Sequence, residues 1–248
     1  MRILEGKGVT KYFGGLAAIS NVDFHVEQGE ILGLIGPNGA GKTTLFNLIS
    51  AAVVVDSGVI SFKGRKISGL KPYQICRTGI ARTFQSVKVF PNMKVLQNVM
   101  LGFLFGTSTG MSQKNATERA MELLDFVGLS ARRGVLARDL TLANQKRLEV
   151  AKALATAPEL LMLDELIAGL NPTETVEVME LAVRIRDRGI CILMIEHVMK
   201  AIMTICDRIM VLHHGNKIAE GTPQEIASSK TVIEVYLGES AHAGSQQR

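Results

Sequence analysis

Residues 36–43 of the chain read Gly-Pro-Asn-Gly-Ala-Gly-Lys-Thr. The glycines can adopt backbone angles that are closed to other residues, so that consecutive amides can point inward at phosphate oxygens. Lys42 can place a positive charge on the outer phosphates, and the Thr43 hydroxyl can bind Mg²⁺. Apolar stretches at 31–35 and 44–49 flank the loop as a strand and a helix, whose N-terminus favours an anion. The stretch therefore predicts a phosphate-binding loop (P-loop) for a nucleoside triphosphate, against the alternative of a glycine-rich turn that happens to fit.

Short apolar stretches alternate with helical patterns along the rest of the chain. The stretches Leu160–Leu163 and Ile190–Ile195 have the composition of buried strands, and the patterns at Asn144–Thr156 and Thr173–Arg188 are helical. This alternation predicts an α/β fold with a mostly parallel core sheet that helices cover on both faces. Strand patterns dominate the first third of the chain, where we expect an antiparallel β region.

The pattern becomes mainly helical near Val95, which suggests an insertion in the α/β core. We expect a helical subdomain at 86–140, with the two parts of a nucleotide-binding core at 1–85 and 141–238. Residues 239–248 are small and polar, which is typical of a disordered tail.

Composition narrows the class of protein. The net charge is +5 without a run of basic residues, so we expect no nucleic acid partner. Cys76, Cys191 and Cys206 lack metal-ligand spacing, which favours reduced thiols and a cytoplasmic location. The N-terminus has no secretory pattern, and no apolar stretch approaches the roughly twenty residues that cross a bilayer. If the protein works at a membrane, another chain must supply the span.

Two carboxylates follow the apolar stretch Leu160–Leu163. An aspartate at the end of a buried strand beside a P-loop can hold Mg²⁺ through water, which is the role expected for Asp164. The adjacent Glu165 can polarise an attacking water. Many strands end in acidic residues, so it is the P-loop earlier in the chain that favours this interpretation.

Five other positions carry weaker signals, and for three of them a structural alternative is open. Gln85 could touch Mg²⁺ or water, or be an ordinary surface residue. A histidine such as His197 is more often a hydrogen-bonded residue beside the core, but its place after a buried strand, at the edge where ligands collect, favours a role near the γ-phosphate. Asn171 and Pro172 have the pattern of a helix cap and first helical residue. Phe13 could stack on adenine or belong to the core.

Taken in order, the stretches GPNGAGKT, RTFQ, LTLANQKRLEVAKAL, LMLDE, AGLNP and EH resemble the ATP-binding subunits of ABC transporters over residues 1–240. The resemblance implies ATP and Mg²⁺ as cofactors, with Glu165 as the catalytic base and His197 as a switch that senses the γ-phosphate. Mg²⁺ would be bound by Thr43, Gln85 and, through water, Asp164. The residues that it places on ATP are Phe13, Gly36, Pro37, Asn38, Gly39, Ala40, Gly41, Lys42, Thr43, Thr44 and Gln85.

The resemblance also implies that two such subunits sandwich two ATP molecules. Thr141, Ala143 and Asn144 would contact the ATP of the partner subunit, and Gly169 and Asn171 would lie in a turn at the dimer contact. The chain departs from the family at three places. Its signature reads Leu-Thr-Leu-Ala-Asn instead of Leu-Ser-Xaa-Gly-Gln, a leucine replaces the proline after the catalytic glutamate, and residues 52–55 read Ala-Val-Val-Val. The first departure bears on the rate of ATP turnover.

Finer features resemble the ATPases of branched-chain amino acid importers, and among these the longer of the usual two. They are FGGLAAISNVDF, ARTFQSVKVFPNMKVLQNVMLG, AGLNPTE and VIEVYLGE. This resemblance implies a separate transmembrane permease, a second ATPase subunit of the same or another kind, and, indirectly, a periplasmic solute-binding protein. The chain would then lie peripherally on the cytoplasmic face of the inner (plasma) membrane.

Other members of the same class remain alternatives. A urea or amide importer shares much of the pattern, and the ATPase of a lipid or lipopolysaccharide exporter shares the architecture. A non-transport ABC ATPase of DNA repair or translation usually has two ATPase units or a long coiled coil, which this chain lacks. A P-loop kinase would lack the LTLAN, AGLNP and EH stretches.

Overall fold

The computed structural model describes residues 1–106 and 111–243. Contacts within the chain divide it into two compact units, residues 1–71 with 193–248 and residues 72–192. The stretch 86–140, predicted as a separate helical subdomain, lies inside the second unit. That unit also contains residues 72–85 and 141–192, which the sequence assigned to the nucleotide-binding core.

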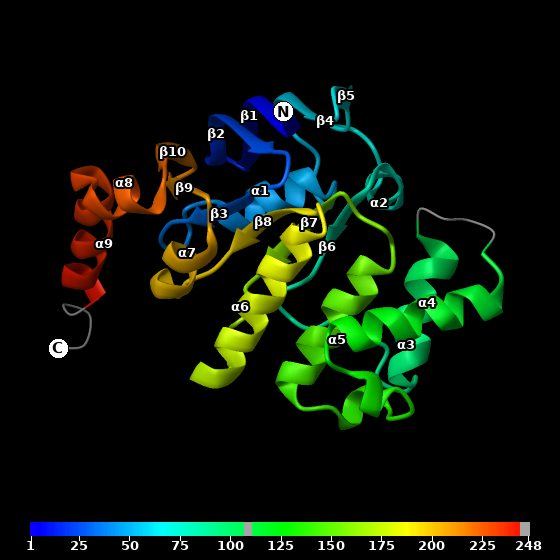
Figure 1. The fold of residues 1–248 in the computed structure, drawn as a ribbon. Coiled ribbons are helices and arrows are strands. Elements are labelled where there is room, and N and C mark those ends of the chain that lie inside the picture. The colour runs from blue at the N-terminus through cyan, green and yellow to red at the C-terminus, as the bar shows by residue number, and fades with distance from the viewer. Residues whose placement is uncertain (107–110, 244–248) are drawn as a thin grey trace. The chain divides into compact units, whose positions relative to one another are not determined.

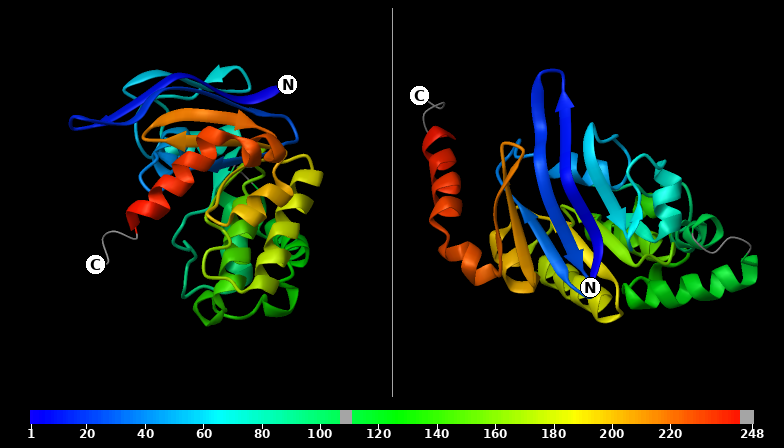
Figure 2. Two further views of the ribbon diagram at one scale, coloured as in Figure 1. Left: turned by 90° about the vertical axis from the view of Figure 1, so that its left-hand side faces the viewer. Right: turned by 90° about the horizontal axis from the view of Figure 1, so that it is seen from above.

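The first unit contains the antiparallel sheet expected near the N-terminus. Its strands are β1 (Arg2–Phe13), β2 (Leu16–Glu27), β4 (Ser57–Phe62) and β5 (Arg65–Lys66), in the order β2-β1-β4-β5. Strands β1 and β2 form a long hairpin that turns at two glycines (Figures 1 and 2). Alternate residues of β2, including Val22, Phe24 and Val26, are buried, so one face of the hairpin packs into the core.

The first unit also holds the strand that leads into the P-loop. Every residue of β3 (Ile31–Ile35) is buried, and β3 pairs in parallel with β9 (Arg208–His213). Strand β10 (Asn216–Gly221) runs antiparallel to β9. The helices are α1 (Lys42–Ile49), α7 (Met199–Ile205), α8 (Pro223–Ser228) and α9 (Lys230–Ala243). Helix α9 extends into the stretch predicted as a disordered tail, and residues 244–248 of that tail lie outside the described residues.

The second unit combines a parallel strand pair with most of the helices. Strands β6 (Ile80–Arg82) and β7 (Leu160–Asp164) pair in parallel. The helices are α2 (Pro72–Thr78), α3 (Val95–Phe105), α4 (Gln113–Phe126), α5 (Leu142–Leu154) and α6 (Pro172–Asp187), with two short 3-10 turns at Ser130–Arg132 and Ala137–Asp139. Helix α3 packs against α4 and α5. Strand β8 (Cys191–Ile195) crosses the division between the units.

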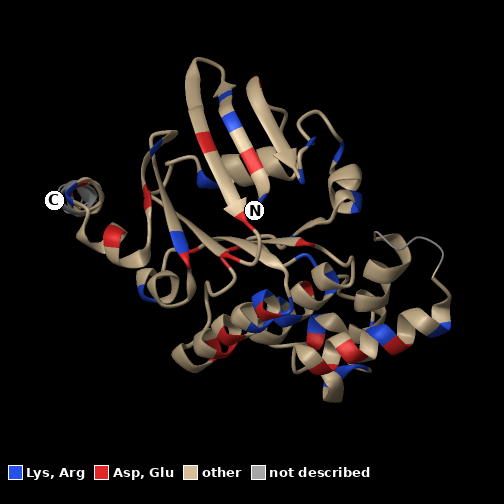
Figure 3. Cartoon of the chain, turned by 45° about the horizontal axis from the view of Figure 1, so that its top comes forward, with Lys and Arg blue, Asp and Glu red and all other residues tan. Residues whose placement is uncertain are grey.

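The parallel pairs in both units agree with the predicted α/β class. Basic and acidic residues are interspersed on the helices of the second unit (Figure 3). Within the residues that the structure describes, no helix has the length and apolar character needed to span a membrane.

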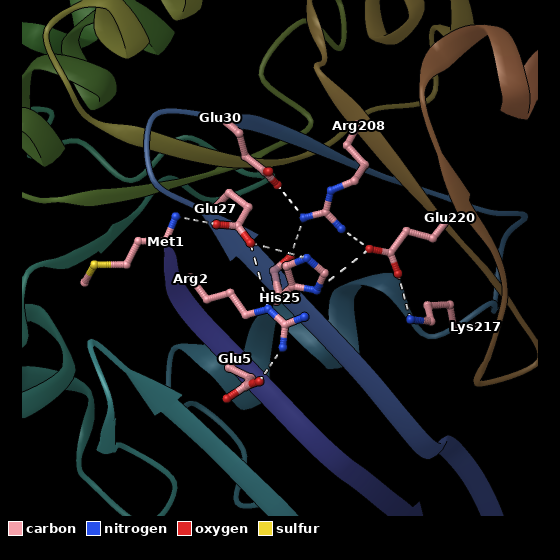
Figure 4. Close-up of polar contacts among 9 residues, drawn as sticks. All are labelled: Met1, Arg2, Glu5, His25, Glu27, Glu30, Arg208, Lys217 and Glu220. Atoms are coloured by element: carbon pink, nitrogen blue, oxygen red, sulfur yellow. Dashed lines mark hydrogen bonds and ion pairs between the residues drawn. The ribbon is translucent and has the colours of Figure 1, made fainter.

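A cluster of charged residues fixes the start of β3 beside β9 and β10 (Figure 4). The Arg208 guanidinium donates to Glu30 Oε1 at 2.6 Å and to the carbonyl oxygen of His25 at 2.8 Å, and its other nitrogen pairs with Glu220. Glu30 is only 8% exposed, and its burial raises the pKa of its carboxyl although Arg208 opposes that shift. The strand leading to the P-loop is therefore anchored by a largely desolvated ion pair.

Replacing Arg208 by methionine should lower the free energy of unfolding by about 3 kcal/mol at neutral pH, because it leaves Glu30 buried without its cation. A carboxyl whose pKa is raised in the folded state destabilises the fold only when ionised. The deficit of Arg208→Met should therefore shrink as the pH falls to about 4, where glutamate becomes protonated. Urea denaturation of the variant and the wild type at both pH values measures this.

The matched control is Lys217→Met, since Lys217 pairs with Glu220 at 2.7 Å in a more exposed position. This change should cost less than about 1 kcal/mol. If Arg208→Met costs no more than the control, the buried pair does not stabilise the fold.

Candidate functional site

Two glycines of the P-loop are required by the approach of other backbone segments of the first unit. Gly36 has φ +149° and Gly41 has φ +104°. A Cβ atom at Gly36 would lie 2.1 Å from the carbonyl oxygen of Leu212, and one at Gly41 would lie 2.5 Å from that of Ala18. Any side chain at either position would displace the loop, so the P-loop pattern here reflects tertiary packing as well as phosphate binding.

Lys42 lies at the centre of the P-loop. Its side chain is buried, and Nζ donates to the carbonyl oxygens of Gly36 at 2.6 Å and Pro37 at 2.9 Å. Helix α1 begins at Lys42, with Gly41 as an N-cap that makes no side-chain hydrogen bond. The next residue, Thr43, is exposed. The loop thus presents a helix N-terminus, an ammonium group and a hydroxyl together, which is the chemistry that a triphosphate needs.

The rest of the predicted P-loop set is divided between the surface and the interior. Asn38 and Gly39 are exposed, Thr44 is half-buried, and Pro37 and Ala40 are buried. The buried pair therefore supports the loop, and the exposed residues are accessible to a ligand.

Phe13 and His197 are both exposed in the first unit. Phe13 ends β1 at the hairpin turn with 51% of its surface exposed, and Lys11 Nζ lies 5.5 Å from the centre of its ring. Asp56 holds this end of the strand by accepting from Lys11 Nζ and from the Tyr12 amide, each at 2.7 Å. His197 lies in the bend after β8. The alternative of a core position, which the sequence left open for Phe13, is therefore excluded.

The second unit brings Gln85, Asp164 and Glu165 together. Asp164 ends β7, is buried, and pairs through Oδ2 with Arg82 Nη2 at 2.7 Å. Gln85 Nε2 donates to Glu165 Oε2 at 2.8 Å, and Lys146 Nζ donates to the carbonyl oxygen of Glu165 at 2.9 Å. These contacts hold both the carboxylate and the backbone of the residue predicted to be the catalytic base.

Glu165 has φ +49°, a backbone angle that is uncommon for a residue with a side chain. Such conformations persist only where the surroundings enforce them, and they concentrate at functional sites. Here the Lys146 ammonium and the Gln85 amide supply that support. The strained backbone at Glu165 is consistent with the predicted role of its carboxylate, which must point at the attacking water to accept a proton.

The residues predicted to bind Mg²⁺ offer suitable atoms. Thr43 supplies an exposed hydroxyl, Gln85 an exposed amide, and Asp164 a carboxylate at the end of a buried strand. Oxygen ligands of this kind suit Mg²⁺. Each of these side chains is therefore chemically suited to the ion, and Arg82 compensates part of the Asp164 charge.

The signature stretch differs from its predicted form. Helix α5 begins at Leu142, two residues before the predicted Asn144, because Thr141 caps it by accepting from the Asn144 amide at 3.4 Å. Ala143 and Asn144 therefore lie in the first helical turn. The Ala143 side chain is buried, so only its backbone could face a ligand, and its φ is not positive. The backbone conformation at this position does not require glycine.

The prediction for Asn171 and Pro172 is confirmed. Asn171 Oδ1 accepts from the Glu174 amide at 2.9 Å, the Glu174 carboxylate accepts from the Asn171 amide at 3.1 Å, and Pro172 is the first residue of α6. Gly169 precedes this cap with φ +78°. The structure describes this turn within one chain only, so its role in a dimer stays a prediction.

Sequence reasoning missed several charged and polar residues that contact Asp164, Glu165 or the backbone of the segment 84–90. They are Arg82, Asn98, Lys146, Glu149 and Lys152. All but Arg82 lie on α3 or α5, and the sequence signal was the presence of polar or charged side chains among the apolar residues of these helices. Asn98, Lys146 and Glu149 are buried, and buried polar side chains are almost always hydrogen-bonded.

A family model described as ABC transporter matches residues 19–168. The chain belongs to this family, whose ATP-binding domains bind ATP or ADP. A second model, described as Branched-chain amino acid ATP-binding cassette transporter, matches residues 216–242. The chain is also 41% identical to the high-affinity branched-chain amino acid transport ATP-binding protein LivG of Salmonella typhimurium, over 96% of this chain and 98% of that protein.

Solved structures confirm the predicted fold class of a P-loop NTPase of the ABC type. The ADP conformation of MJ1267, an ATP-binding cassette of an ABC transporter, has a TM-score of 0.86 and 31% identity, with 96% of this chain and 99% of that one covered. A dimeric post-hydrolysis structure of the cassette MJ0796, bound to ADP and Pi, has a TM-score of 0.80 and 25% identity, with coverage of 89% and 98%.

Proposed function

We propose that this chain is the ATP-hydrolysing subunit of an ABC importer for branched-chain or related amino acids. The observation that carries the proposal is the 41% identity to LivG over nearly the whole chain. The match of residues 216–242 to the branched-chain amino acid family supports the same substrate class. These two observations favour the branched-chain amino acid importer over a urea or amide importer, a lipid exporter and a non-transport ATPase.

In the proposed reaction, residues of the P-loop bind the phosphates of ATP and the exposed Phe13 ring stacks on adenine. Thr43, Gln85 and, through water, Asp164 would hold Mg²⁺, which supplies charge compensation on the phosphates when it is bound. Glu165 accepts a proton from the attacking water, and the Gln85 amide keeps its carboxylate oriented. His197, exposed after β8, contacts the γ-phosphate.

We propose that the working unit contains two ATPase subunits, identical or different. The first turn of α5, with Thr141, the backbone of Ala143 and Asn144, faces the ATP of the partner subunit as a helix N-terminus. Gly169 and Asn171 lie in the turn at the dimer contact. The dimeric cassette MJ0796 supports this assembly for a related chain.

A transmembrane permease is the proposed partner, with a periplasmic solute-binding protein as an indirect one. The segment 84–90, which we call the docking segment, exposes two large apolar rings, Phe84 at 45% and Phe90 at 49%. Two exposed aromatic rings within one short segment suit a partner surface. The chain would act on the cytoplasmic face of the plasma membrane.

The test is uptake by the chain reconstituted in vesicles with the membrane subunits that co-purify with it and their solute-binding protein. ATP-dependent uptake of labelled leucine is expected, with competition by valine and isoleucine and none by urea. The complex with Glu165→Gln is the control, and its uptake should fall in proportion to its ATP hydrolysis. Uptake of urea instead of leucine would establish the amide importer, and ATP-dependent export of lipid would establish the exporter.

A further inference from the structure

Helix α5 presents three charged residues, spaced three apart, to the backbone of other segments of the second unit. Glu149 is the most informative of them. It is 2% exposed, and its Oε1 accepts from the backbone amides of Phe84 at 3.3 Å and Lys88 at 3.1 Å. Burial raises the pKa of the Glu149 carboxyl, and the two amides oppose that shift. A buried carboxylate thus accepts two hydrogen bonds from backbone amides of the docking segment.

Lys152 and Asn98 hold the same segment from two helices. Lys152 Nζ donates to the carbonyl oxygen of Lys88 and lies 5.3 Å from the centre of the Phe90 ring. Asn98, on α3, is fully buried, accepts from the Phe90 amide at 2.8 Å and donates to the Phe90 carbonyl at 3.1 Å. The docking segment is therefore fastened by its backbone, while the rings of Phe84 and Phe90 remain exposed for a partner.

The same helix also reaches the catalytic residue. Lys146, one turn before Glu149, donates to the backbone carbonyl of Glu165, and Thr141 caps the N-terminus of α5. One helix therefore carries the signature turn, a hold on Glu165 and two holds on the docking segment. A helix is a rigid element that can carry a displacement between such points.

We propose that Glu149 and Lys152 are positioning residues that couple the docking segment to α5, so that engagement by the permease is transmitted to the signature turn and to Glu165. The coupling runs through charge-assisted hydrogen bonds to backbone atoms in a desolvated setting, where such bonds are strong. Apart from the contact of Lys152 with the Phe90 ring, it does not depend on side chains of the docking segment, and the rings of Phe84 and Phe90 are about half exposed. The proposal rests on the proposed function, since it takes residues 84–90 to be the site of docking.

The first test uses amide hydrogen exchange of the full chain. Glu149→Met keeps the length of the side chain but removes the acceptor, whereas Glu149→Gln retains an oxygen at the same position. Exchange at the Phe84 and Lys88 amides should rise about tenfold or more in Glu149→Met, because their hydrogen-bond acceptor is gone. It should stay within about threefold of wild type in Glu149→Gln. Equal exchange in all three proteins would overturn the proposed hold.

The second test compares ATP hydrolysis by the isolated chain with hydrolysis in complex with its membrane subunits. In Glu149→Met, the stimulation by the membrane subunits should fall about threefold to tenfold, and Glu149→Gln should restore it. Hydrolysis by the isolated chain should fall by a smaller factor. A parallel fall of both activities, or unchanged stimulation despite faster exchange, would overturn the coupling.

A second variant keeps the test decisive if Glu149→Met fails to fold. Lys152→Met removes the contacts to Lys88 and Phe90 and should also lower the stimulation of ATP hydrolysis by the membrane subunits. Normal stimulation would overturn the role of Lys152.

A crosslink tests docking itself. A cysteine at Ser86, in the otherwise wild-type chain, should crosslink to a membrane subunit, and one at Gln224 on α8 should not. Failure of the Ser86 crosslink would refute docking at this segment, and the proposed coupling with it. The exchange measurement does not depend on docking, so its outcome distinguishes this failure from a failure of the Glu149 contacts.

Discussion

Replacing Glu165 by glutamine is expected to slow ATP hydrolysis by about a hundredfold or more while ATP still binds. The glutamine amide cannot accept a proton from water, and this is the step assigned to Glu165. The backbone contact from Lys146 does not depend on the side chain, and Gln85 can still donate to the amide oxygen. The strained local conformation should therefore persist, and an ATP-bound dimer should accumulate. Phosphate release and light scattering with ATP and Mg²⁺ measure the two effects.

The matched control is Glu180→Gln, an exposed position on α6, which should hydrolyse ATP like wild type. If Glu165→Gln also hydrolyses at the wild-type rate, Glu165 is not the base. If it loses ATP binding as well, the residue acts in forming the site and not in the chemical step.

Replacing Lys42 by alanine should weaken ATP binding by about a hundredfold, because a hydrogen-bonded charge on the phosphates is lost. The structure adds a second consequence. The Lys42 ammonium holds the carbonyl oxygens of Gly36 and Pro37, so its loss should also loosen the P-loop without ATP. Titration with a fluorescent ATP analogue measures the first effect, and hydrogen exchange over residues 36–41 measures the second.

Two further variants control for the loss of side-chain bulk at position 42 and for the loss of a positive charge elsewhere on the chain. Lys42→Met keeps most of the side-chain bulk but makes neither hydrogen bond, and it should bind ATP as weakly as Lys42→Ala. Lys71→Ala removes an exposed lysine and should bind ATP normally. Wild-type affinity in Lys42→Ala would show that the P-loop is not where the triphosphate binds.

The sequence by itself determined the features that depend on neighbouring residues. The buried strand β3 and the helix α1 flank the P-loop as predicted, because the spacing of apolar residues along the sequence indicates which segments are buried. The cap at Asn171 and the first helical position of Pro172 were also predicted, since both belong to one turn. The start of α5 was predicted two residues late, because Thr141 was not taken as the cap.

Only the tertiary structure decided which residues distant in sequence meet. The need for glycine at position 36 comes from the carbonyl of Leu212, and the support of Glu165 comes from Gln85 and Lys146. The charged side chain of Glu149 stands out among the apolar residues of α5, but no local sequence pattern tells which backbone amides it meets. Packing brings such groups together, and their hydrogen bonds are then required because a buried polar group without a partner is costly.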